Sequence, residues 1–268
     1  MEGFTVMTER TYVITGAASG IGAATSMLLK ERGANVIEVD IHNCEVVADL
    51  STVVGRASAI AYVKELSKGK IDAIIPCAGS VRANVQTVSI NFFGVTDFIT
   101  GLLPTLNESP APRVATISSV ASLLPNSSEL IDAMLAHDEP RTLNIAQGLV
   151  DQAPQLGGLI YASTKQALSR WIRRESIKQE WAGAGIPLNA VAPGMVETPM
   201  IAKMVATPDS RAATDALIPM PLNYYLKPRQ VAYLLAWLTS EENTHITGQT
   251  IYIDGGSDAL IRGENIWE

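Results

Sequence analysis

Short apolar runs alternate with longer helical segments along most of the 268-residue chain. Apolar runs separated by helices of roughly 10–15 residues predict βαβ units and a parallel sheet. The right-handed crossovers of such units place helices on both faces of the sheet. We therefore expect an α/β fold in which residues 1–268 form a single doubly wound domain. The predicted strands are residues 11–15, 35–39, 46–48, 71–76, 113–117, 189–192 and 249–253.

The composition narrows the functional classes. With 47% apolar and 18% charged residues, the chain can build a large core. A net charge of −7 argues against binding to a nucleic-acid backbone. The two cysteines, Cys44 and Cys77, are too few for a disulfide scaffold. No apolar run approaches the roughly 20 residues of a membrane span. Residues 1–10 lack a signal-peptide pattern. We expect a cytoplasmic protein with neither a membrane nor a nucleic-acid partner.

One segment, about residues 120–158, interrupts the alternation. It contains no strand-like run, and its helical signals cover residues 129–137 and 141–152. The strand pattern resumes after it, which indicates an insertion into the domain rather than a linker between domains.

The first strand is followed by a glycine-rich string, Thr-Gly-Ala-Ala-Ser-Gly-Ile-Gly, and then by a helix predicted over residues 22–32. Glycines in this position permit a tight turn and a close approach of the backbone to a pyrophosphate, while the helix N-terminus supplies free N–H groups. The string lacks the Gly-Lys-Ser/Thr ending of a P-loop. We predict a dinucleotide site at Gly16, Ser19, Gly20, Ile21 and Gly22.

Asp40 follows the second predicted strand, 18 residues after Gly22. A carboxylate there can accept hydrogen bonds from both ribose hydroxyls and repels a 2′-phosphate. Residues 15–22 contain no Arg or Lys that would attract such a phosphate. The predicted cofactor is therefore NAD rather than NADP.

A second motif, Tyr161-Ala-Ser-Thr-Lys165, begins a helical segment predicted to reach about residue 181. The i, i+4 spacing puts both side chains on one helix face. A nearby ammonium favours a phenolate and lowers the tyrosine pKa, so the pair could exchange a proton with a carbinol oxygen. Alone, such a pair is usually an ordinary surface pair. The interpretation as a proton-transfer pair is favoured only because the dinucleotide motif is also present.

With these motifs the sequence resembles a classical short-chain dehydrogenase/reductase over the whole chain except the insertion. The resemblance implies a Rossmann-type domain with a seven-stranded parallel sheet. Pro76 and Cys77 stand where the family has two asparagines, so that motif's side-chain hydrogen bonds should be missing. The resemblance extends the cofactor site to Asp49, Leu50, Cys77, Ala78, Gly79, Tyr161, Lys165, Pro193, Gly194, Val196 and Thr198.

The resemblance also implies the catalytic set Asn91, Ser119, Tyr161 and Lys165, with Ser118 as the alternative serine. In the implied mechanism, hydride passes between the nicotinamide and the substrate carbon while Tyr161 exchanges the oxygen-bound proton. Ser119 positions the substrate oxygen, Lys165 lowers the tyrosine pKa, and Asn91 holds a relay water. The three histidines lack metal-ligand spacing, so we expect no metal.

The 42 positions from Ser119 to Tyr161 resemble the branch that contains hydroxysteroid dehydrogenase/carbonyl reductases and coniferyl-alcohol dehydrogenase-like enzymes. This implies a hydrophobic secondary alcohol and its ketone as substrates. A terpenoid or aromatic alcohol remains an alternative, and so does a non-enzymatic dinucleotide sensor. A Met-rich lid over about residues 195–226 suits an apolar substrate.

The insertion should obstruct the surface through which family members pair the helices that carry Asn91 and Tyr161. The apolar segment 230–238 and the last strand then remain as an interface. We therefore expect a homodimer built there. The same apolar character would equally fit a helix buried within one subunit.

Overall fold

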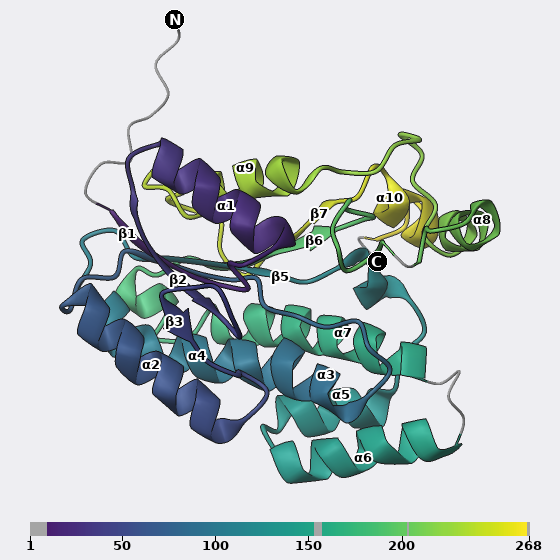
Figure 1. Ribbon diagram of the computed structural model, residues 1–268, viewed down its shortest axis with the longest axis horizontal. Helices are drawn as coiled ribbons and strands as arrows, with labels where there is room; N and C mark the ends of the chain where they lie inside the picture. The colour runs from purple at the N-terminus through teal and green to yellow at the C-terminus, as the bar shows by residue number, and fades with distance from the viewer. Residues whose placement is uncertain (1–9, 153–156, 203, 267–268) are drawn as a thin grey trace, which may run out of the picture.

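Seven parallel strands form one sheet in the order β3-β2-β1-β4-β5-β6-β7 (Figure 1). The computed structural model describes residues 10–152, 157–202 and 204–266. Each predicted apolar run lies on a strand, so the predicted α/β fold class is confirmed. The strands are β1 (Thr11–Thr15), β2 (Asn35–Asp40), β3 (Val46–Val47), β4 (Ala73–Pro76), β5 (Arg113–Ile117), β6 (Leu188–Pro193) and β7 (Thr250–Ile253).

The strand order reverses between β1 and β4, which are neighbours in the sheet. In open parallel sheets, ligands bind outside the carboxyl ends of the strands at such a switch point. β1, β4 and β6 are buried along their whole length, as expected of central parallel strands covered on both faces. The continuous apolar runs in the sequence follow from this double burial.

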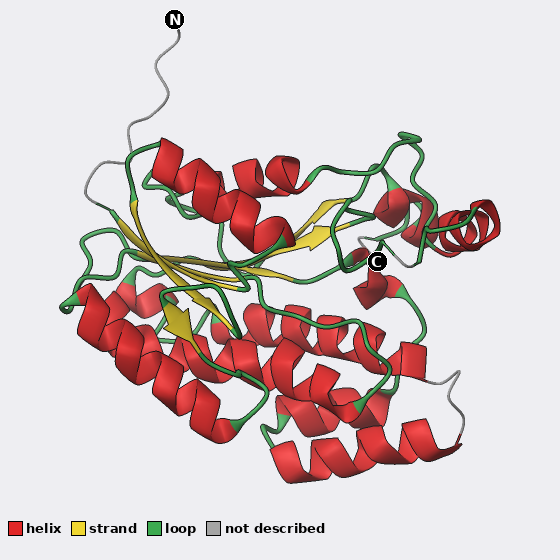
Figure 2. Ribbon diagram, viewed as in Figure 1, coloured by secondary structure: helices red, strands yellow, loops and turns green. Residues whose placement is uncertain are grey.

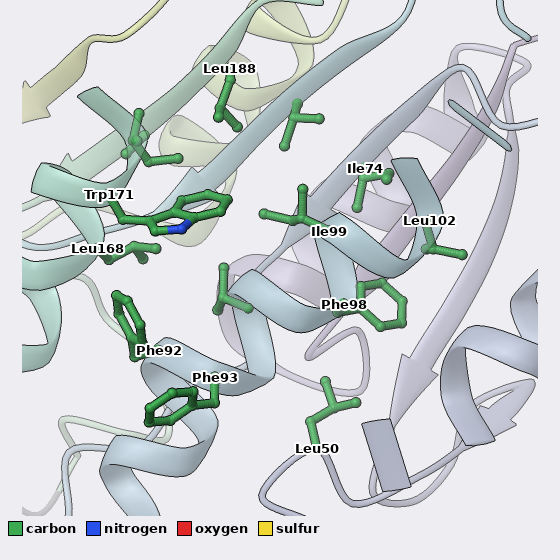
Figure 3. Close-up of a cluster of buried hydrophobic side chains, with 14 of the residues drawn as sticks. Leu50, Ile74, Phe92, Phe93, Phe98, Ile99, Leu102, Leu168, Trp171 and Leu188 are labelled. Carbon is green, nitrogen blue, oxygen red and sulfur yellow. The ribbon is translucent and has the colours of Figure 1, made fainter. Parts of the chain in front are cut away.

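Helices cover both faces of the sheet, as Figure 2 shows. One face carries α1 (Gly20–Glu31) and α9 (Pro228–Leu238), and the other carries α2 (Val53–Ser67), α4 (Gly94–Leu106) and α7 (Gly157–Glu175) (Figure 1). The larger hydrophobic core lies on this second face and includes Phe92, Phe98 and Trp171 (Figure 3).

The insertion forms η2 (Val120–Leu123), α5 (Ser128–Leu135) and α6 (Glu139–Gln152). The predicted helices at 129–137 and 141–152 are confirmed, with starts shifted by one or two residues. α5 and α6 lie beneath α7 and α3 (Val85–Val88) and form a third layer (Figure 1). Remaining described elements are η1 (Ser89–Phe93), η4 (Ala182–Ala184), α8 (Pro208–Leu217) and α10 (Ser257–Arg262).

The bounds of two other predicted helices were also wrong. α1 begins at Gly20, two residues before the predicted start at Gly22. The helix that carries Tyr161 begins at Gly157, four residues before its predicted start, and it ends at Glu175 instead of reaching about Trp181. After Glu175 the chain folds back through two turns, in which the Lys178 N–H donates to the Glu175 carbonyl and the Trp181 N–H donates to the Lys178 carbonyl. The Trp181 ring then packs edge-on against the Trp171 ring, with 6.3 Å between the ring centres.

The apolar side of segment 230–238 faces inward. Val231, Ala232 and Leu235 of α9 are fully buried and pack with Leu28 and Leu29 of α1. The apolar pattern is therefore explained by packing within one subunit. On the outer side of the helix, Tyr233 and Trp237 remain exposed.

Candidate active site

The glycine loop between β1 and α1 depends on the absence of side chains at two positions. Gly16 has φ 70°, and a Cβ there would lie 2.6 Å from the backbone nitrogen of Ala78. A Cβ at Gly22 would lie 2.2 Å from the Gly16 carbonyl oxygen. The loop therefore packs directly on the end of β4, and α1 packs directly on the loop.

The start of α1 offers donors to an anion. The Ser19 side chain makes no capping hydrogen bond, so it does not occupy the N–H groups of the first helical turn. Gly20 lies close to Thr198, since a Cβ at Gly20 would come within 3.3 Å of the Thr198 methyl group. Two predicted cofactor segments that are far apart in the chain therefore meet at this helix terminus.

Asp40, the last residue of β2, joins the strand to the glycine loop. Its Oδ2 accepts a hydrogen bond of 3.0 Å from the Ala18 N–H, and its Oδ1 accepts one of 2.7 Å from the Ile41 N–H. These bonds fix the carboxylate at the carboxyl end of the sheet. A carboxylate held there by backbone donors suits a diol of a ribose and disfavours a phosphate.

A cavity opens beside Asp40. It is walled mainly by apolar groups and has two carboxylates among its lining residues. Ile41, Ala48 and Ile90 also line it, although the motif analysis did not select them. Their position next to Asp40, Asp49 and Asn91 in the sequence was the available signal. The full lining is Gly16, Asp40, Ile41, Ala48, Asp49, Leu50, Ala78 and Ile90. These residues fit an adenosine, which has a flat apolar base and a polar sugar.

The end of β4 is held without the two asparagines of the family motif. The Thr116 hydroxyl donates to the Pro76 carbonyl at 2.9 Å, and the Cys77 N–H donates to the Thr15 carbonyl at 3.0 Å. The Ala78 N–H donates to the Thr15 hydroxyl at 3.2 Å. Threonines on the two neighbouring strands thus supply the cross-links. Burial raises the pKa of the Cys77 thiol to about 12, so this group is an inert thiol.

Asn91 lies in η1, a single π-helical turn between α3 and α4. Its side chain is fully buried and links three segments. The Oδ1 atom accepts from the Ser80 N–H at 2.8 Å, while Nδ2 donates to the Ser80 carbonyl at 2.9 Å and to the Thr164 hydroxyl at 3.1 Å. π turns inside helices occur frequently at functional sites. The sequence analysis selected Asn91 but did not predict the π turn.

The structure separates the two candidate serines. Ser119 follows β5; its hydroxyl accepts from the Ala121 N–H at 3.1 Å and lies beside Tyr161, whose pKa it acts to lower. Ser118 points elsewhere: its hydroxyl donates to the Lys165 carbonyl at 3.1 Å and lies 2.8 Å from the Ser169 hydroxyl. Ser119 is therefore the serine placed beside the tyrosine.

Lys165 lies one turn after Tyr161 on α7, as the spacing predicts. Its ammonium is 5.7 Å from the centre of the tyrosine ring and donates to the Ile117 carbonyl at 2.9 Å. Burial lowers the pKa of Lys165 to about 8. Burial also raises the pKa of Tyr161, and only the hydrogen bond from Ser119 acts to lower it. In this geometry desolvation outweighs the groups that lower the pKa of Tyr161. The expectation that Lys165 lowers the tyrosine pKa stays a prediction.

Residues 193–198 continue from the end of β6 toward the same edge. The Gly194 N–H donates to the Ile253 carbonyl at 3.0 Å, and Val196 forms an isolated bridge with Leu226. The predicted lid follows and includes α8. A small apolar cluster joins the lid to η2, immediately after Ser119. It consists of Val120, Met195 and Ile218, with Leu123, Leu124, Ile201, Val205, Met220 and Tyr225 packed against them.

A dinucleotide cradle at the switch point of a doubly wound sheet, beside a serine, a tyrosine and a lysine, defines a nucleotide-dependent oxidoreductase. The family model described as enoyl-(acyl carrier protein) reductase matches residues 16–258. The chain is 38% identical to the 3-alpha-hydroxysteroid dehydrogenase/carbonyl reductase of Comamonas testosteroni over 93% of this chain and 97% of that protein. The chain belongs to the short-chain dehydrogenase/reductase family.

Two further relatives are consistent with this membership. The crystal structure of the 3-alpha-hydroxysteroid dehydrogenase from Pseudomonas sp. B-0831 complexed with NADH has a TM-score of 0.87 and 36% identity, covering 96% of this chain and 100% of that one. The 3beta-hydroxysteroid dehydrogenase 1 of Eggerthella lenta is 29% identical over 92% of this chain and 93% of that protein.

None of the described helices combines the length and hydropathy that a bilayer span requires.

Proposed function

We propose that the protein is an NAD(H)-dependent oxidoreductase that interconverts a hydrophobic secondary alcohol and its ketone. The observation that carries this proposal is the placement of Ser119 and Lys165 around the buried Tyr161, with the Lys165 ammonium 5.7 Å from the tyrosine ring. Lys165 also lies near the predicted cofactor segment after β4, since a Cβ at Gly79 would come within 3.9 Å of its Nζ atom. Relatives of 38% and 36% identity are hydroxysteroid dehydrogenases, which favours this substrate class.

Each residue has a proposed role. The bound cofactor supplies or accepts the hydride. Tyr161 donates the proton to the substrate oxygen in reduction, because its raised pKa keeps the phenol protonated near neutral pH. Ser119 orients that oxygen by a second hydrogen bond, and Lys165 binds the nicotinamide ribose. Asn91 fixes Ser80 and Thr164 around the site and takes part in the proton relay through a held water.

The proposed cofactor contacts come from the ends of five strands. α1 and the glycine loop hold the pyrophosphate, Asp40 holds the ribose, and Asp49 and Leu50 contact the adenine. The segment after β6 cradles the carboxamide. The full proposed set is Gly16, Ser19, Gly20, Ile21, Gly22, Asp40, Asp49, Leu50, Cys77, Ala78, Gly79, Tyr161, Lys165, Pro193, Gly194, Val196 and Thr198.

NAD is the proposed cofactor in preference to NADP. The Asp40 carboxylate lines the predicted adenosine cavity and would repel a 2′-phosphate. We expect kcat/KM to be at least about tenfold higher with NADH than with NADPH, which corresponds to about 1.4 kcal/mol of discrimination. Steady-state kinetics with both cofactors measure this ratio, and a preference for NADPH would contradict the assignment.

The substrate side is apolar. The cluster around Val120, Met195 and Ile218 connects the lid to the turn after Ser119, which favours an apolar ketone or alcohol. A terpenoid or aromatic alcohol would suit the same apolar surface. An NADH-oxidation screen over steroid ketones, cyclic terpenones and aromatic aldehydes distinguishes these substrates.

The decisive variant is Tyr161→Phe, which removes only the hydroxyl. We expect turnover to fall by at least about 10³-fold while the Kd for NADH stays within about twofold, because general acid–base catalysis typically contributes 10²–10⁴-fold. Substantial residual turnover would exclude Tyr161 as the proton donor. NADH binding without turnover of any screened carbonyl compound would favour the dinucleotide-sensor alternative.

We also propose that the whole chain forms one catalytic domain and works in the cytoplasm as a homodimer. α5 and α6 cover the face of α7, which leaves the β7 edge and the exposed Trp237 of α9 for subunit contact. Both cysteines are free thiols, consistent with a reducing compartment. Light scattering should give twice the chain mass. A stable tetramer joined through α4 and α7 would contradict the proposed interface.

A further inference from the structure

A charged cluster joins the insertion to the core at the start of α4. Arg56 of α2 is buried, and its Nε atom lies 2.8 Å from an Asp97 carboxylate oxygen on α4. The same guanidinium contacts Glu139 of α6 at 2.5 Å. His137, between α5 and α6, places its Nε2 atom 2.8 Å from the other Asp97 oxygen. Two residues of the insertion therefore bind one ion-pair network of the core.

The His137 ring also contacts the π turn directly. Its ring centre lies 5.3 Å from that of Phe93 in an edge-on arrangement, and 6.4 Å from that of Phe92. The two phenylalanines pack edge-on against each other at 5.3 Å (Figure 3). They are the two residues that follow Asn91 in the chain. The insertion thus contacts the backbone turn that carries the proposed catalytic asparagine.

We propose that His137 is a positioning residue for catalysis, which braces the Phe92–Phe93 pair and thereby holds the π turn and Asn91 in place. This rests on the proposed dehydrogenase function. A π turn departs from the regular i→i−4 ladder and is rare as a local structure, so contacts outside the helix must maintain it. His137 supplies such a contact from the insertion.

Backbone and side-chain contacts hold His137 in place. Its backbone has φ 58°, which an ordinary residue adopts rarely, and its N–H donates to the Met134 carbonyl at 2.8 Å. The charged groups that face the imidazole are Asp97, Glu139 and Arg56. The hydrogen bond to Asp97 raises the pKa of His137, so the charged form of the ring is favoured at the brace.

The test replaces His137 by Asn, which tolerates the left-handed backbone conformation but removes the ring and the charge. We expect kcat to fall about tenfold, because displacement of a site group by a fraction of an ångström is costly. The KM for NADH should change less than kcat does, since Ile90 is the one residue of the π turn that lines the cofactor cavity. Hydrogen exchange of the amides in residues 89–93 should accelerate in parallel.

The matched control is Arg174→Gln. Arg174 of α7 also ties the insertion to the core, by donating to the Leu135 carbonyl at 2.9 Å, but it has no contact with the π turn among those described. This variant should keep the wild-type kcat and the wild-type exchange at residues 89–93. Equal losses of kcat in both variants would overturn the proposal, because they would indicate general loosening of the insertion. An unchanged kcat in H137N would overturn it as well.

A second variant, Phe93→Leu, covers the case in which H137N does not fold. It keeps the His137–Asp97 contact and removes the ring contact, so kcat and exchange should change as in H137N; wild-type values for both would overturn the brace. The exchange measurement needs no turnover. If the wild-type protein reduces no carbonyl compound, the proposed function fails, while faster exchange in H137N and F93L still supports the brace.

Discussion

The insertion and the lid are two additions that flank the same proposed active site, and they are built differently. The insertion contributes Leu130, Ile131 and Met134 to the main core, where all three are buried. In the lid, α8 buries only Thr214 among its residues, and large apolar side chains such as Leu217 remain exposed. One addition has become part of the scaffold, whereas the other lies mainly on the surface.

The polar contacts differ in the same way. The insertion is held by the Arg56 network, whose guanidinium is only 3% exposed. The lid is flanked by the Lys227–Glu197 pair, in which both side chains are largely exposed. A buried network fixes geometry, while an exposed pair adds little stability. We infer that the insertion positions catalytic groups and that the lid provides adaptable apolar surface for the substrate.

The largest expected difference comes from the same substitution in both regions. Leu130→Ala should lower the free energy of unfolding by about 2–5 kcal/mol, because it leaves a cavity in the core. Leu217→Ala should change it by no more than about 0.5 kcal/mol, since the side chain is already 56% exposed. Denaturant unfolding measures both. A loss of more than about 2 kcal/mol for the lid variant would show that the lid is also scaffold.

A second pair of variants compares the ion pairs. Arg56→Met leaves Asp97 and Glu139 without their shared cation and should cost about 3 kcal/mol of stability. Lys227→Met, which removes the exposed lid pair with Glu197, should cost less than about 1 kcal/mol. Thermal or denaturant unfolding of the two proteins measures the difference. Equal costs would mean that the insertion network is no more buried in solution than the lid pair.

The enzyme activity should depend on pH through the charge of Lys165 on α7. Burial lowers the pKa of Lys165 to about 8, so the lysine loses its charge above that value. We expect kcat/KM for carbonyl reduction to be constant below about pH 8 and to fall above it, several-fold by pH 9. A pH–rate profile measures this. A profile that stays flat to pH 10 would show that Lys165 remains charged in the working enzyme.

The smallest expected effect concerns stability and pH in the insertion. The pKa of His137 is raised above its unfolded value by the hydrogen bond to Asp97. Its contribution to stability is therefore complete below an unfolded pKa of about 6.5 and is lost as pH rises through the folded pKa. The Tm of the wild type should fall slightly over this range, relative to H137N. Replacing His245 should preserve the decrease, and the same slope in H137N would contradict the assignment.

Much of this fold follows from local sequence signals. The strands at residues 11–15 and 113–117 were predicted with their observed bounds, since a continuous apolar run fits a strand buried on both faces. The Gly16–Gly22 loop was predicted because no other residue type permits its backbone contacts. Helix ends were less predictable: nothing local distinguishes residues 176–181 from the helix that precedes them.

The sequence by itself determined the parallel sheet, the dinucleotide loop and the residue types of the proposed catalytic set, because periodicity, glycine and i, i+4 spacing act over a few residues. Only the tertiary structure decided which serine meets Tyr161, that burial raises the tyrosine pKa, and that Asn91 lies in a π turn. It also decided that the insertion joins the core through His137 and Arg56. These features depend on contacts between residues tens of positions apart, and local patterns carry no record of such contacts.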